Sequence, residues 1–134
     1  MSFDPRTLSK PAYEALRDLR ANRSKDDPHV KEQKNQAVEL YTYIATWGLL
    51  RLKAEELALS QQGKKDVVKA YFTCLADIVG QPELKQATKS GLNFLIQEST
   101  SVEQYLGLTG LGLAIAQEFS FWAAAVYHDV KGGE

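Results

Sequence analysis

The longest apolar stretch of the chain lies between Ser101 and Asp129, and its spacing predicts one long helix. Thr100 precedes Glu103 by three residues, which is the arrangement of a capping box, and no proline follows. Bulky apolar side chains recur at helical spacing and form one stripe: Tyr105, Leu108, Ile115, Phe119, Trp122 and Val126. A helix that is apolar on most sides is usually buried, so we expect this one at the centre of the domain.

A second stripe of the same segment consists mostly of small residues: Gly107, Gly110, Ala114, Gln117 and Ala124. Small side chains let the backbone of a neighbouring helix approach closely. We therefore expect another helix to pack on this stripe.

The amino-terminal region predicts a helix that begins near Pro5 or Pro11 and ends at about Arg23, because proline is tolerated in the first turn of a helix. Its apolar side is narrow and consists of Ala12, Leu16 and Leu19. An adjoining aromatic and basic stripe consists of Tyr13, Arg17 and Arg20.

A second helix is predicted from Pro28 to about Gln62, after a polar turn that ends in an Asp-Pro pair. Its first turns are polar and are expected to stand off from the other helices or to fray. Gly48 is unfavourable inside a helix and predicts a kink or a crossing point, and Gly63 is a natural stop.

A third helix is predicted over residues 64–79 and a fourth over residues 82–97, with Gly80 and Pro82 between them. No segment alternates convincingly between apolar and polar positions, so no sheet is expected. The pattern predicts an all-α, single-domain bundle of about five helices that covers residues 1–134, with the apolar carboxyl-terminal helix buried.

Composition limits the classes of function. The chain has 16 Lys and Arg against 17 Asp and Glu, and a net charge of -1, so it lacks the overall positive charge of many DNA-binding domains. One cysteine allows no internal disulfide, and the first residues lack the pattern of a signal peptide, which favours the cytoplasm. Gln117, Glu118 and three glycines interrupt the longest apolar run, so we expect no membrane span.

The residues suited to catalysis are sparse. His29, His128 and Cys74 do not supply a nucleophile, base and orienting group, or enough ligands for zinc, so we expect no enzyme, no metal and no cofactor. Glu118 lies within the apolar helix and must reach solvent, a cation such as Arg17 or Arg51, or another chain.

Two basic groups are candidates for contacts with nucleic acid. Lys64, Lys65 and Lys69 gather at the start of the third helix, where the macrodipole and free N–H groups favour an anion. Arg17 and Arg20 combine charge with one stacking ring. Each group has a simpler interpretation as well: a solvated helix start for the lysines, and pairing with acidic neighbours for the arginines.

Two stretches resemble a known family. The first runs from Tyr43 to Leu50 and continues into Arg51, and the second is the apolar segment from Tyr105 to Ala125. They are similar to the Gly-Leu element and the closing helix of the small subunits of type III CRISPR effector complexes, in particular the Cmr-type small-subunit family. Length, an early arginine-rich helix and all-α character agree, whereas Gln117 and Glu118 stand where that family usually has basic residues.

The resemblance implies a non-catalytic, cytoplasmic subunit of an antiviral ribonucleoprotein that stacks with copies of itself. Such a subunit braces guide RNA and target RNA against larger subunits of the complex, through phosphate contacts that do not read bases. By their positions, we expect these contacts at Arg17, Arg20, Lys64, Lys65 and Lys69. The alternative is a protein-only helical adaptor or dimerisation module without nucleic-acid contact, which uses an exposed part of the final helix or the aromatic face of the second helix.

Overall fold

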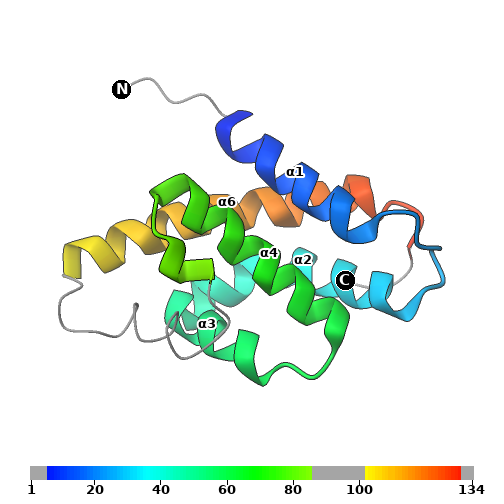
Figure 1. Cartoon of the computed structure of the whole chain (residues 1–134), viewed down its shortest axis with the longest axis horizontal. Coiled ribbons are helices and arrows are strands. Elements are labelled where there is room, and N and C mark those ends of the chain that lie inside the picture. Colours follow the sequence, from blue (N-terminus) through cyan, green and yellow to red (C-terminus); the bar gives the residue numbers. More distant parts are fainter. Residues whose placement is uncertain (1–5, 86–101, 131–134) are drawn as a thin grey trace.

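The computed structural model of the chain describes residues 6–85 and 102–130, and every regular element in these two ranges is a helix (Figure 1). The α-helices are α1 (Arg6–Arg20), α2 (Pro28–Trp47), α3 (Leu49–Ala58), α4 (Gln62–Val79) and α6 (Val102–Val126). A short 3-10 helix, η1, covers Pro82–Lys85. The predicted all-α bundle is therefore confirmed.

Helix α6 lies beside α1 and α2, and α4 packs across α1 and α2 (Figure 1). Their inward side chains form one apolar core, and its largest members include Leu16, Leu40, Tyr71, Phe72 and Phe119. Burial of such side chains is the main favourable contribution to folding. The core therefore fixes α1 and α6 side by side.

Helix α1 ends earlier than predicted, at Arg20 instead of about Arg23. Ala21 follows with a backbone φ of 49°, in the left-handed region that residues with a side chain rarely adopt. This conformation turns the chain away from the helix axis. The helix already includes Pro11, so the earlier of the two predicted starts is the better one.

The start of α2 confirms one prediction and contradicts another. Asp27 begins the helix as predicted, because its carboxylate accepts a hydrogen bond from the His29 N–H at 2.8 Å. The polar first turns do not stand off, since Gln33 is buried. Its amide donates to the Leu19 carbonyl at 3.3 Å and accepts from the Tyr127 hydroxyl at 2.8 Å, and these bonds offset the cost of burying it.

The single helix predicted from Pro28 to Gln62 is wrong, because α2 and α3 are separated at Gly48. Gly48 has φ 93° and ψ 165°, a conformation that glycine adopts without steric cost. Its N–H donates to the Ile44 carbonyl at 2.9 Å and closes α2, and the fully buried Leu49 opens α3. The kink predicted at this glycine is confirmed and amounts to a complete break.

Gly63 does not stop a helix, contrary to the prediction, since α3 already ends at Ala58 and Gly63 lies in the first turn of α4. A Cβ atom at Gly63 would lie 2.7 Å from the Cβ of Glu32 on α2. The residue therefore allows a close approach of α2 and α4 that no larger side chain would permit.

Helix α4 ends where predicted. Gly80 adopts a left-handed conformation, with φ 71°, and its N–H donates to the Ala76 carbonyl. The predicted fourth helix over residues 82–97 begins as η1, and its remainder lies outside the described residues.

Only one side of α6 is buried. Ile115 and Phe119 of the predicted apolar stripe are in the core, together with Ala123 and Tyr127. The partner of the predicted capping box, Thr100, and the side chain of Tyr105 lie outside the described residues. The other side of α6 is exposed, so burial of this helix is less complete than its composition indicates.

Most of the predicted stripe of small residues on α6 is not a helix contact, and of its members Ala114 alone packs against the core. Gly107 and Gly110 are exposed, and a Cβ atom on either would meet nothing within 4 Å. The close approach occurs at Gly112, whose carbonyl accepts a hydrogen bond from the buried Tyr71 hydroxyl at 2.8 Å. Within the described ranges, none of the helices combines the length and apolar character needed to span a membrane.

Candidate functional site

The two arginines of the predicted nucleic-acid site are both engaged within the chain. Arg20 forms two hydrogen bonds with the Asp129 carboxylate, at 2.5 and 3.0 Å, and a third with the Val126 carbonyl at 2.8 Å. Its side chain is only 14% exposed. The hydrogen bond from Arg20 lowers the pKa of Asp129 to about 2 and the pKa of Arg20 itself is raised. Arg20 therefore ties α1 to the end of α6.

Arg17 is more exposed than Arg20 but shares its charge with acidic neighbours. Its guanidinium lies 3.3 Å from the Asp18 carboxylate and 4.0 Å from that of Glu14. It also lies over the Tyr13 ring, 5.7 Å from the centroid. Pairs of this kind are weak at the surface, so Arg17 remains able to reach an external anion.

The lysines at the start of α4 are less engaged by other side chains than the two arginines are. Lys69 is exposed, and Lys64 and Lys65 are half-buried. None of the three forms an ion pair with another described residue. Lys65 and Lys69 are one turn apart and share a side of α4. The lysine cluster, Lys64, Lys65 and Lys69, is therefore the predicted basic group whose charge is least neutralised.

A carboxylate of the chain itself already occupies the start of α4, next to the lysine cluster. Glu32 of α2 accepts a hydrogen bond from the Gly63 N–H at 2.8 Å, in the position that a phosphate would take at a free helix terminus. A phosphate bound here would contact the lysine side chains instead of the first N–H groups of α4. The lysines and the arginines lie on two helices, α4 and α1, that pack against each other (Figure 1).

Glu118 does not pair with either of the two arginines considered for it. The Ser9 hydroxyl of α1 donates a hydrogen bond to its carboxylate. Arg51 lies instead over the exposed ring of Trp47, 4.9 Å from the centroid. Glu118 therefore helps to hold the start of α1 against the second half of α6.

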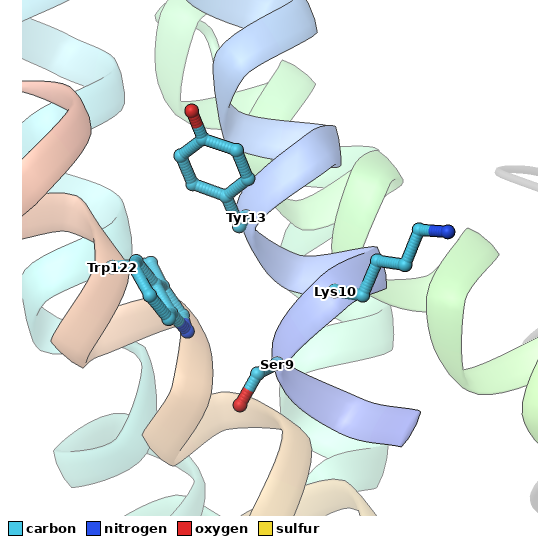
Figure 2. Close-up of a pocket in the computed structure, with 4 residues that line it drawn as sticks. All are labelled: Ser9, Lys10, Tyr13 and Trp122. Carbon is cyan, nitrogen blue, oxygen red and sulfur yellow. The ribbon is translucent and has the colours of Figure 1, made fainter. Parts of the chain in front are cut away.

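Beside this hydrogen bond is an apolar hollow of about 480 Å³, lined by Ser9, Lys10, Tyr13 and Trp122. Figure 2 shows the Tyr13 and Trp122 rings at the opening between the two helices, while Lys10 extends away from Trp122. The rings meet edge to face, with centroids 5.4 Å apart. The sequence placed Trp122 on the core-facing stripe and did not predict this hollow, because pairing of α1 with α6 is a tertiary contact.

A buried ion pair is the other polar feature that the sequence did not reveal. Lys53 and Glu56 of α3 are almost completely buried, and Lys53 Nζ lies 2.7 Å from Glu56 Oε1. Lys53 also donates to the Leu84 carbonyl at 2.6 Å and lies over the Phe72 ring at 4.3 Å. Burial lowers the pKa of Lys53, against the opposing effect of Glu56. The signal in the sequence that could have indicated this pair is the spacing of Lys53 and Glu56, which are opposite charges three residues apart on a helix.

The three residues considered for catalysis differ in burial. Cys74 is buried, and burial raises the pKa of its thiol to about 11, which keeps it protonated and unreactive at neutral pH. His29 and His128 are exposed, as expected. Among residues 6–85 and 102–130, no group of three or more His, Cys, Asp or Glu side chains could hold a metal ion.

No family model, no curated protein and no solved structure matches the chain. The resemblance to type III CRISPR small subunits therefore remains a prediction that depends on the two stretches described above.

Proposed function

We propose that the chain is a non-catalytic helical subunit of a type III CRISPR RNA-guided effector complex. In this role it stacks with copies of itself, contacts larger subunits and braces guide RNA and target RNA through their phosphates. The observation that carries the proposal is the Gly48-Leu49 step. It lies within the stretch that resembles the family's Gly-Leu element, and there the chain ends one helix and opens another on a buried leucine.

The lysine cluster supports the RNA contact. Three ammonium groups without ion-pair partners among the described residues can neutralise phosphates without reading bases. Arg17 can add a fourth contact beside the Tyr13 ring. Arg20 is not part of the proposed contact, because binding a phosphate would require it to leave Asp129 and the Val126 carbonyl.

The test is binding of a fluorescently labelled single-stranded RNA, measured by anisotropy at several salt concentrations. If three lysines contact phosphates, affinity should fall on the order of 20-fold between about 50 and 200 mM salt, independently of sequence. Lys64→Glu with Lys65→Glu should weaken binding and flatten the salt dependence, with unchanged circular dichroism. Equal binding by this variant and the unchanged chain would exclude the lysine cluster as the contact.

A second function is favoured by the near-neutral charge and by the commitment of Arg20 to Asp129. This is the protein-only helical adaptor, whose contacts are apolar. Two large aromatic side chains on α1 and α6, Tyr13 and Phe121, are exposed and would serve such contacts. Absence of salt-dependent RNA binding, with a protein contact that persists in high salt, would support the adaptor in place of the RNA-bracing subunit.

A further inference from the structure

The most exposed large apolar side chain among the described residues is Phe121, at 65%. It projects from α6 directly beside the apolar hollow, because its ring meets that of Trp122 edge to face at 5.1 Å and Trp122 lines the hollow. A large ring in water loses the free energy that its burial would provide. A protruding ring and a hollow that could receive a ring therefore lie side by side on one surface.

The protruding ring and the hollow lie at the same level along the two helices. Helices α1 and α6 run in the same direction here, since Ser9 contacts Glu118, and Arg20 contacts Val126 roughly two to three turns later along both helices. Tyr13 meets Trp122 between these two contacts. A two-fold axis parallel to the helices would therefore place Phe121 of each copy over the hollow of the other.

We propose that two copies of the chain form a closed two-fold pair through this surface, the α1–α6 face, with each Phe121 seated in the hollow of its partner. The inference rests on the proposed function and adds to it a paired contact between copies that is separate from the stacking contact. A closed pair uses the same face twice, whereas a stack uses two different faces, so a stack would need a further surface.

The lack of charge on the α6 part of the α1–α6 face favours protein over RNA as its occupant. The exposed row of α6 on either side of Phe121 is uncharged and consists of Gln117, Ala124 and Ala125. The small alanines let a second backbone approach, and no cation on this row could meet a phosphate. On α1, Lys10, Glu14 and Arg17 alternate in sign and remain at the rim, where water screens them.

The size of the face sets the expected strength. Helix α1 has 15 residues, so it is about 22 Å long, and two adjacent helices are roughly 20 Å wide. Such a face gives a total buried area of roughly 1,000 Å², below the range of most stable dimers. The pair should therefore be weak, with a Kd on the order of 10 to 100 μM.

The test is sedimentation velocity of the full chain from about 1 to about 500 μM, a range that spans the expected Kd. The unchanged chain should shift from monomer to dimer and no further. Phe121→Asp should weaken the pair at least 100-fold, because each dimer carries the substitution twice, and Phe121→Leu should weaken it less. Leu57→Asp on α3 is the matched control: Leu57 is 40% exposed, and its substitution should leave the Kd within twofold.

A second measurement uses the two tryptophans, Trp47 and Trp122. With Trp47→Phe, emission comes from Trp122 alone, and it should move to shorter wavelength as the pair forms and water leaves the hollow. Phe121→Asp should abolish this shift while circular dichroism stays unchanged.

Three results would overturn the inference: a chain that stays monomeric at the highest concentration, a dimer that Phe121→Asp leaves intact, or Phe121-dependent species larger than a dimer. Failure of the proposed function is separate. RNA binding that persists in Phe121→Asp, without a dimer in any variant, rejects the pair alone. A Phe121-dependent dimer that does not bind RNA rejects the RNA-bracing function alone.

Discussion

Lys53 and Arg20 make the same kind of contact in two different surroundings. Each cation pairs with one carboxylate and donates to one backbone carbonyl, and each joins segments distant in sequence. The Lys53 and Glu56 side chains are 1% and 0% exposed, whereas those of Arg20 and Asp129 are 14% and 38% exposed. Water therefore stabilises the separated charges of the second pair but not those of the first.

This difference in burial gives the two pairs different roles. A buried pair is costly to break, although its net contribution to stability is small, because both charges have lost their hydration. A pair at the surface contributes modestly and is screened by salt. For Arg20 the consequence bears on the proposed RNA contact, since Asp129 already holds its guanidinium.

The largest expected effect follows removal of one buried partner. Glu56→Ala should lower the free energy of unfolding by about 3 kcal/mol, because it leaves the Lys53 charge buried without a carboxylate. The Leu84 carbonyl and the Phe72 ring remain beside Lys53. The loss of stability should therefore lie at the lower end of the range for buried ion pairs that lose one partner. Urea denaturation measures it, and the neighbouring Glu55→Ala should change stability by less than about 0.5 kcal/mol. Equal effects of the two substitutions would contradict this interpretation of the pair.

Removal of both buried charges should recover the loss. Lys53→Met with Glu56→Leu fills similar volume with apolar atoms, and we expect stability within about 1 kcal/mol of the unchanged chain, or above it. The Leu84 carbonyl then loses its donor, which limits the gain. If the double variant is as unstable as Glu56→Ala, the ion pair stabilises the fold more than apolar side chains of similar volume do, which would contradict this expectation.

The pair at the surface should appear in the dependence of stability on acid. The folded pKa of Asp129, about 2, lies below its ordinary value of 3.8. Its contribution is therefore fully present above about pH 4 and is lost as the pH falls through about 2. The difference in melting temperature between the unchanged chain and Arg20→Gln should shrink across this window. A difference that stays constant to the lowest pH would show that the pair does not contribute through its charge.

The smallest expected effect concerns RNA. Arg20→Gln should change RNA affinity by less than about twofold, because Asp129 already holds the guanidinium. Lys65→Gln should lower the slope of log affinity against log salt concentration by the equivalent of about one phosphate contact. Anisotropy titrations of both variants provide the measurement. A larger loss for Arg20→Gln than for Lys65→Gln would mean that RNA displaces Asp129.

Local signals in the sequence predicted the elements better than their contacts. Gly48, Gly80 and the Asp27 cap are encoded by residues adjacent to the features they cause, so the corresponding boundaries were predictable. The prediction that Gly63 stops a helix was wrong, because the sequence does not distinguish a glycine that ends a helix from one that allows a neighbouring helix to approach. The burial of Gln33 was not predicted, because it depends on a hydrogen bond from Tyr127, which lies far along the chain.

The same limit applies to the candidate site. The lysine cluster was visible because its members are neighbours in sequence, and the engagement of Arg20 was not, because Asp129 lies 109 positions away. The hollow beside Trp122 depends on the register between α1 and α6, which the apolar spacing of either helix leaves open.

The carboxyl-terminal end of α6 is fastened to two helices at once. Arg20 of α1 holds Asp129, and Lys34 of α2 donates to the Val130 carbonyl at 2.5 Å. A mechanical load applied beyond Val130 would therefore divide between the first and second helices and would not peel the last turn away alone.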